Sequence, residues 1–231
     1  MQICGLQKTT LLDYPGYVAA TIFLGSCNFR CPFCHNMNLV ISPATQPTVS
    51  EKDVFTFLET RRGILDGVCI TGGEPTISLG LIPFIKKIKS LGYLVKLDTN
   101  GYFPDAIMDL CRMNLLDYIA MDIKSSPAGY ANATGLTSVD MSLIEKSIHY
   151  IMNASVPYEF RTTVIKEYHD ETTMQDIGKL IEGAEAYYLQ SFVDSDQVSD
   201  HSLHACTKEE LLHYQELLTP FVKEVTLRGI D

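Results

Sequence analysis

The chain has 231 residues, of which 46% are hydrophobic and 20% charged, as in a globular protein with a sizeable core. A formal net charge of −10 disfavours nucleic acid as the main partner, because phosphate binding needs clustered Lys and Arg. The start MQICGLQKTTLLDYPG lacks the features of a signal peptide, and no apolar run approaches the roughly 18 residues of a membrane span. We therefore expect a cytoplasmic protein with no membrane partner.

Strand-like and helix-like segments alternate along the chain. Apolar and β-branched runs predict strands at 17–24, 66–71, 93–99, 118–124, 158–165, 186–192 and 222–229. Apolar residues at helical spacing predict helices at 50–62, 77–92, 104–114, 140–154, 172–183 and 207–220. Local signals support these bounds, since Ser50 is a good N-cap and Gly92 and Gly183 are typical of helix ends.

This alternation indicates parallel strands joined by helical crossovers. About six such units fit, which is fewer than the eight of a closed barrel. No GxGxxG follows the first strand, which disfavours a two-half dinucleotide fold. The sequence therefore predicts an α/β protein, a partial, open (β/α)6 barrel, in a single domain over residues 1–231 with a long mobile loop at 193–200.

Polar segments follow the predicted strand ends. They read, in chain order, CNFRCPFCHN, TGGEPT, LDTNG, MDIK, RTT and QSF. In barrels of this kind the carboxyl ends of the strands carry the chemistry, because they meet at one edge of the sheet. We therefore expect these segments to line one cavity.

The seven cysteines are unevenly placed. Cys27, Cys31 and Cys34 fall within eight positions, whereas the others are scattered: Cys4, Cys69, Cys111 and Cys206. Tight spacing without a disulfide framework indicates metal or redox chemistry. Structural zinc sites and iron–sulfur clusters normally take four protein ligands, so a fourth ligand is in question. Either another residue such as His35 supplies it, or one metal is left open.

The pattern C-x3-C-x2-C with Phe33 before the last cysteine, followed by TGGEP, resembles the radical S-adenosylmethionine (SAM) superfamily. LLDYPG, LDTNG and MDIK further resemble activating enzymes of glycyl radical enzymes, above all those of anaerobic ribonucleoside-triphosphate reductase. The resemblance covers about residues 4–192 and includes the cysteine loop 25–38, whereas 193–231 carry little signature. One departure is Ser26, where many relatives have glycine; we expect little consequence.

The resemblance implies a [4Fe–4S] cluster held by Cys27, Cys31 and Cys34, with an open iron chelated by SAM. Reductive cleavage of SAM then yields methionine and a 5′-deoxyadenosyl radical, which abstracts a hydrogen atom. The implied partners are a glycyl radical enzyme, first the anaerobic reductase, and an electron donor such as flavodoxin or ferredoxin.

The motifs also assign residues to SAM. The turn of Gly72, Gly73 and Glu74 is expected at the SAM amino group, although a tight turn alone would explain the glycines. Lys124 is expected at the SAM carboxylate, and Arg161 at SAM or at a buried carboxylate. The other residues expected to contact SAM are Phe33, His35, Asn100, Gln190, Asp98 and Asp122.

Asp98, Thr99 and Asp122 form a candidate monovalent-cation site, as in related activases. Two adjacent carboxylates are costly unless a cation intervenes. The alternatives are that the two carboxylates lie apart in solvent or that Lys124 neutralises them.

Three other functions remain open. The chain could activate a pyruvate formate-lyase-like enzyme, or it could be a small-molecule radical SAM enzyme of the deazaguanine-precursor type. LDTNG and MDIK favour an activase over the small-molecule enzyme. A non-enzymatic zinc or iron module of the three cysteines and His35 would leave TGGEP and Lys124 without a purpose.

Overall fold

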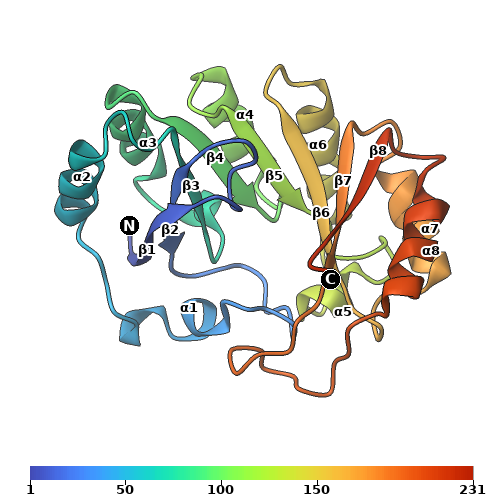
Figure 1. Cartoon of the computed structure of the whole chain (residues 1–231). Helices are drawn as coiled ribbons and strands as arrows, with labels where there is room; N and C mark the ends of the chain where they lie inside the picture. The colour runs from blue at the N-terminus through green and yellow to red at the C-terminus, as the bar shows by residue number, and fades with distance from the viewer. Residues whose placement is uncertain (231) are drawn as a thin grey trace.

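The computed structural model describes residues 1–230, which contain one eight-stranded sheet (Figure 1). The strands lie in chain order across the sheet: β1 (Ile3–Thr10), β2 (Ala19–Leu24), β3 (Gly67–Gly72), β4 (Leu94–Thr99), β5 (Tyr118–Asp122), β6 (Tyr158–Val164), β7 (Ala186–Ser191) and β8 (Glu224–Arg228). β1 is antiparallel to β2, and all later pairs are parallel. β1 and β8 form the two edges, so the barrel is open, as the sequence predicts.

Six longer helices connect the parallel strands and cover the outer face of the curved sheet (Figure 1). They are α2 (Glu51–Thr60), α3 (Leu81–Ser90), α4 (Pro104–Arg112), α6 (Met141–Asn153), α7 (Glu171–Leu180) and α8 (Lys208–Leu218). Side chains accept backbone N–H bonds at several N-termini, including the predicted Ser50 and the capping box of Thr207 and Glu210. None of the helices in residues 1–230 has the length and apolar character needed to cross a membrane.

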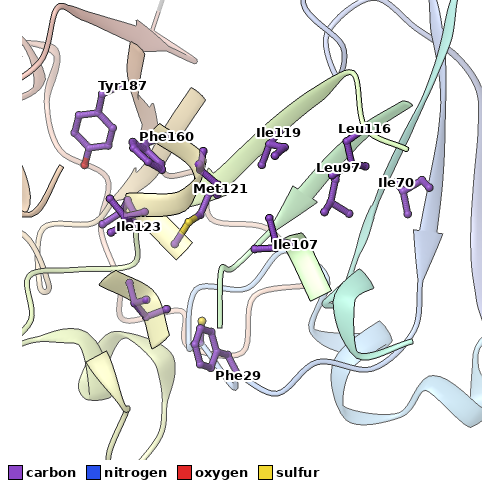
Figure 2. Packing of buried hydrophobic residues seen from close by; sticks show 14 of the residues in the cluster. Phe29, Ile70, Leu97, Ile107, Leu116, Ile119, Met121, Ile123, Phe160 and Tyr187 are labelled. Atoms are coloured by element: carbon purple, nitrogen blue, oxygen red, sulfur yellow. The ribbon is translucent and has the colours of Figure 1, made fainter. Parts of the chain in front are cut away.

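The apolar core lies between the sheet and these helices. Leu97, Ile119, Met121 and Phe160 come from successive strands and are fully buried, as is Ile107 of α4 (Figure 2). Burying each such side chain contributes about 1.5–3 kcal/mol. The strand ends are thus carried on a packed and rigid support.

One strand and two short α-helices were not predicted from the sequence: the edge strand β1, α1 (Met37–Ile41) and α5 (Tyr130–Thr134). β1 reads ICGLQKTT, is half exposed and pairs only with β2, so its pattern of apolar residues is weak. α1, α5 and the loop after β7 gather at the carboxyl ends of the strands, at the bottom of Figure 1. In that loop, Ser199 donates a hydrogen bond to the Pro32 carbonyl at 3.0 Å, so the predicted loop packs on the cysteine segment.

Candidate active site

A cavity of about 420 Å³ opens at the carboxyl ends of the parallel strands. Its volume lies in the range of about 300–1,000 Å³ that is typical of small-molecule sites. Every site residue predicted from the sequence lines it: Cys27, Cys31, Phe33, Cys34, His35, Gly72, Gly73, Glu74, Asp98, Thr99, Asn100, Asp122, Lys124, Arg161 and Gln190. The tertiary structure therefore brings these separated motifs to one place.

The three cysteines follow β2 and are free thiols. The backbone N–H of Phe29 donates to Cys27 Sγ at 3.4 Å, and Asn100 Nδ2 lies 3.7 Å from the same sulfur. Burial raises the pKa of Cys27 to about 12 and that of Cys31 to about 11, so metal binding would have to displace their protons. Within residues 1–230, no three His, Cys, Asp or Glu side chains meet at the spacing of a single metal ion.

The Gly72–Glu74 turn packs directly against the backbone of the cysteine loop. Gly73 N–H donates to the Leu24 carbonyl and Glu74 N–H to the Ser26 carbonyl, both at 2.8 Å. A Cβ on Gly73 would lie 1.8 Å from the Ser26 oxygen. Close packing of two backbones therefore explains Gly73, whereas Gly72 has a φ of 116°, the unusual backbone angle that a tight turn requires of glycine.

Glu74 is buried and joins the ends of β3 and β4. Its carboxylate accepts hydrogen bonds from Thr99 Oγ1 at 2.8 Å, from Asn100 N–H at 2.7 Å and from Thr76 N–H at 3.1 Å. Burial raises the pKa of Glu74, and these hydrogen bonds oppose that shift. Glu74 thus holds the LDTNG segment beside the cysteine loop.

An alternating chain of charges crosses β4, β5 and β6. Arg161 donates from Nε to Asp122 at 2.9 Å and from Nη1 to Asp98 at 3.2 Å. Lys124 lies 3.0 Å from Asp122, and Lys96 pairs with Asp98. Burial alone would raise the pKa of Asp122, but Arg161 and Lys124 lower it to about 2, so the carboxylate stays ionised.

This network bears on the candidate cation site. Asp98 and Asp122 share the guanidinium of Arg161, so they neither lie apart in solvent nor depend on Lys124 alone. Thr99 directs its hydroxyl to Glu74. The positive charge between the two carboxylates is therefore supplied by Arg161.

Both the backbone and the side chain of Lys124 are held in place, the carbonyl by His169 and the ammonium by Asp122. His169 is buried, and its Nδ1 accepts the Ile165 N–H at 3.0 Å, while its Nε2 lies 3.1 Å from the Lys124 carbonyl. Burial lowers the pKa of His169 to about 4, so the ring is neutral and donates from Nε2. For Lys124, burial opposes the charge, but Asp122 raises the pKa above its usual value, and the ammonium is retained.

The aromatic residues of the cysteine segment contact the later part of the chain. His35 Nε2 lies 2.7 Å from the Val193 carbonyl, and its ring is 5.7 Å from that of Phe192. This bond directs the nitrogen to the backbone, which disfavours His35 as a fourth metal ligand. The Phe33 ring is buried, 5.8 Å from the Tyr168 ring.

Further residues that the sequence did not single out also line the cavity: Asp13, Phe29, Asn36, Val40, Thr71 and Thr163. Asp13 belongs to LLDYPG and accepts a hydrogen bond from Thr21 Oγ1 at 2.5 Å. LLDYPG contributed to the resemblance, so this motif was the available signal. Thr71 and Thr163 likewise belong to the quoted segments TGGEPT and RTT.

Sequence comparison identifies the family. The model of the radical SAM superfamily matches residues 21–180, from β2 into α7. The chain belongs to the radical SAM superfamily. Membership implies SAM and a [4Fe–4S] cluster as cofactors. The backbone and amide donors around Cys27 fit such a group, because hydrogen bonds to cluster sulfurs are a regular feature of iron–sulfur sites.

Two relatives differ in how much of the chain they match. MJ1227 of Methanocaldococcus jannaschii, provisionally named a glycyl-radical enzyme activating enzyme, is 29% identical over 235 residues, covering 99% of this chain and 96% of the relative. A protein of Thermococcus kodakarensis, provisionally named a GTP 3′,8-cyclase, is 28% identical over 147 residues, covering 62% of this chain and 46% of the relative.

Solved structures show the same fold at low sequence identity. SuiB of Streptococcus suis superposes with a TM-score of 0.69 at 13% identity, covering 91% of this chain and 49% of SuiB. TYW1 with a lysine–pyruvate adduct superposes with a TM-score of 0.59 at 15% identity, covering 87% of this chain and 72% of TYW1. The chain spans about half the length of SuiB, and these likenesses establish the open radical SAM barrel.

Proposed function

We propose that this radical SAM protein is an activase that reductively cleaves SAM and generates a glycyl radical on a partner enzyme, in first place an anaerobic ribonucleoside-triphosphate reductase. The observation that carries the proposal is the match to MJ1227 over 99% of this chain and 96% of that protein. The match to the GTP 3′,8-cyclase covers only 62% of this chain. The match to MJ1227 extends over the part after residue 192, which supports an activase over a cyclase.

Cys27, Cys31 and Cys34 would hold the cluster. When bound, the cluster supplies the one electron that splits SAM into methionine and a 5′-deoxyadenosyl radical. The chain contributes the N–H of Phe29 and the amide of Asn100, which orient Cys27. A flavodoxin or ferredoxin would provide the electron.

The charged end of SAM would meet Lys124. Its ammonium lies in the cavity, remains protonated and is fixed by Asp122 and by the bond from His169 to its carbonyl. A positioned ammonium binds a carboxylate as a point charge. The Gly72–Glu74 turn also lines the cavity and would face the SAM amino group, while Arg161 anchors both Asp98 and Asp122.

The rest of SAM would lie along the other cavity walls. Phe33 offers an aromatic face for the adenine, and His35, Asn100 and Gln190 offer polar groups near the ribose and the base. The glycine of the partner would enter from the open side of the barrel. Pyruvate formate-lyase-like enzymes are the second class of partner for the same site.

Electron paramagnetic resonance on the partner tests this proposal. The reconstituted protein is incubated under anaerobic conditions with SAM, dithionite and each candidate glycyl radical enzyme, and a reaction without SAM is the control. We expect 5′-deoxyadenosine, methionine and a glycyl radical doublet on the anaerobic reductase. Cleavage of SAM with turnover of a small molecule and no radical on any partner would contradict the activase assignment and leave the superfamily intact.

A further inference from the structure

Two buried side-chain donors at the cysteine loop have no hydrogen-bond partner. Among residues 1–230, the buried side-chain nitrogen and oxygen atoms without a partner are Asn28 Nδ2 and the Tyr130 hydroxyl. Leaving such a group unpaired costs about 1–3 kcal/mol, and native proteins rarely do so without a reason. Both atoms flank the cysteine loop, which makes a shared reason worth seeking.

The orientation of Asn28 is set by a chain of hydrogen bonds. Tyr102 N–H donates to Asn100 Oδ1 at 3.0 Å, which leaves Asn100 Nδ2 as the donor. This nitrogen donates to Asn28 Oδ1 at 2.8 Å. The Asn28 amide nitrogen is therefore the end of the side chain without a partner, with hydrogens to donate, while its Oδ1 lies 3.8 Å from Cys27 Sγ.

Tyr130 lies on α5, which packs against the cysteine loop. The N–H of Arg30 donates to the Thr134 carbonyl at 2.8 Å, and the rings of Phe29 and Tyr130 lie 6.4 Å apart. A Cβ on Gly135 would lie 2.3 Å from the Arg30 oxygen, so this end of α5 is pressed against the loop. Tyr130 itself is fully buried.

The surroundings of the Tyr130 oxygen point towards the cysteines. The contacts of α5 run to Phe29 and Arg30, the two residues directly before Cys31, so Tyr130 lies on this side of the cysteine loop. Burial raises the pKa of Tyr130, so the hydroxyl keeps its proton. The backbone N–H of Lys124 faces the same oxygen and opposes the shift, although it does not complete a hydrogen bond. That N–H can satisfy only the oxygen, so the hydroxyl proton still lacks an acceptor.

We propose that the Asn28 amide and the Tyr130 hydroxyl are hydrogen-bond donors to the sulfur atoms of the [4Fe–4S] cluster, Asn28 on the side of Cys27 and Tyr130 on the side of Cys31. The proposal rests on the proposed ligation by Cys27, Cys31 and Cys34. Cluster sulfides and thiolates are anionic acceptors, and hydrogen bonds to them tune the reduction potential. A donor stabilises the more negative, reduced state most, so both residues raise that potential and neither is a catalytic residue.

A redox titration of the holoprotein without SAM tests the proposal. One electron from dithionite takes the cluster from the 2+ to the 1+ state, which is followed by its paramagnetic resonance signal against mediator dyes. We expect Tyr130→Phe and Asn28→Leu each to make the potential more negative, with iron and sulfide contents unchanged. For the double variant we expect about a tenfold loss in the equilibrium constant for reduction, or about 59 mV for one electron.

Tyr187→Phe is the matched control. Tyr187 is equally buried, but its hydroxyl donates to Thr162 Oγ1 at 2.6 Å. This variant should lose stability and keep the wild-type potential. Without the cluster, Tyr130→Phe should be at least as stable as the wild type, because it removes an unpaired hydroxyl.

A wild-type potential in Tyr130→Phe holoprotein would overturn the proposal for Tyr130, and the same result in both variants would overturn it entirely. If Asn28→Leu fails to fold, Tyr130→Phe decides. A wild-type protein that retains no iron or sulfide after reconstitution would instead contradict the proposed function, so the two failures are distinguishable.

Discussion

The strand ends of β4–β6 and the cysteine loop line the same cavity, but they differ in whether their polar groups have partners. At the strand ends, Asp98 and Asp122 share Arg161, and each has a lysine partner as well. At the cysteine loop, the three thiols are free, and two buried donors beside them have no acceptor.

The charged groups at the strand ends are therefore already paired, whereas two donors at the cysteine loop still lack an acceptor. Partly buried charges that already have partners hold their geometry before any ligand arrives, which is what a binding site needs from its support. Buried donors without acceptors are costly to the protein alone, and a cluster that binds beside them would offset that cost. Each of the following predictions changes either the cysteine loop or the residues at and near the strand ends.

Removing a loop cysteine should have the largest effect. We expect Cys27→Ser, Cys31→Ser and Cys34→Ser each to abolish iron retention after anaerobic reconstitution, because the loop then lacks a thiolate ligand. Serine at Cys4, Cys69, Cys111 or Cys206 should leave the iron content unchanged. Loss of the cluster in any of these four control variants would contradict the assignment.

Removing Arg161 from the ion-pair network at the strand ends should destabilise the fold. Arg161→Met leaves two partly buried carboxylates to their lysines, and we expect a loss of about 3 kcal/mol in the free energy of unfolding, near the lower end of the costs measured for buried pairs. Urea unfolding of the cluster-free protein measures it. Lys223→Met, which removes an exposed partner of Glu185, should change the free energy of unfolding far less. A similar small cost at Arg161 would show that the network is not structural.

His169 should make stability depend on pH. Its pKa is lowered by burial to about 4 in the folded chain, against about 6.5 when unfolded. As the pH falls from 6.5 to 4, the unfolded state takes up a proton that the folded state does not. Stability is therefore full above pH 6.5 and falls by roughly 3 kcal/mol towards pH 4.

Comparison with a variant isolates this contribution. The free energy of unfolding at pH 7 and at pH 4 should differ less in His169→Gln than in the wild type, by about that 3 kcal/mol. His213 is exposed, so His213→Gln serves as the control and should keep the wild-type difference. An unchanged difference in His169→Gln would mean that the ring takes up a proton in the folded protein.

Lys124 belongs to the ion-pair network at the strand ends and is also the proposed ligand of the SAM carboxylate. We expect Lys124→Ala to weaken SAM binding about ten- to a hundredfold, corresponding to the roughly 1.5–3 kcal/mol of one charge-assisted contact, while the iron content stays normal. Equilibrium binding of SAM to the reconstituted protein measures it. Lys146→Ala removes an exposed ion pair with Asp105 and should leave the affinity unchanged. Equal affinity in Lys124→Ala would remove this residue from the site.

Ser26 should give the smallest effect. It adopts φ 73°, a left-handed conformation that costs a non-glycine residue about 1–2 kcal/mol. The left-handed conformation thus gives the departure from glycine at this position a backbone cost, and the expectation of little consequence stays a prediction. Ser26→Gly should raise the free energy of unfolding of the cluster-free protein by about 1 kcal/mol, measured in urea, whereas a loss of stability would show that the serine makes a compensating contact.

The sequence by itself determined the alternation of strands and helices and the place of the chemistry. Apolar periodicity and helix caps such as Ser50 are local, and they predicted seven parallel strands and six helices. Parallel strands end at one edge, so the motifs after them had to meet, and all the predicted residues do line the cavity. The half-exposed β1 was not predicted, because an edge strand with one neighbour can form with few apolar residues in its sequence.

Only the tertiary structure decided which of these groups bond to one another. Lys96, Asp98, Arg161 and Asp122 come from three strands, and whether a carboxylate meets solvent, a lysine or a guanidinium depends on strand register and burial. The same holds for Asn28 and Tyr130, which lie about a hundred residues apart in the sequence. That their donors are left without acceptors depends on packing from α5 and from Asn100, because hydrogen bonding in a buried site is settled by what lies within about 3 Å in space.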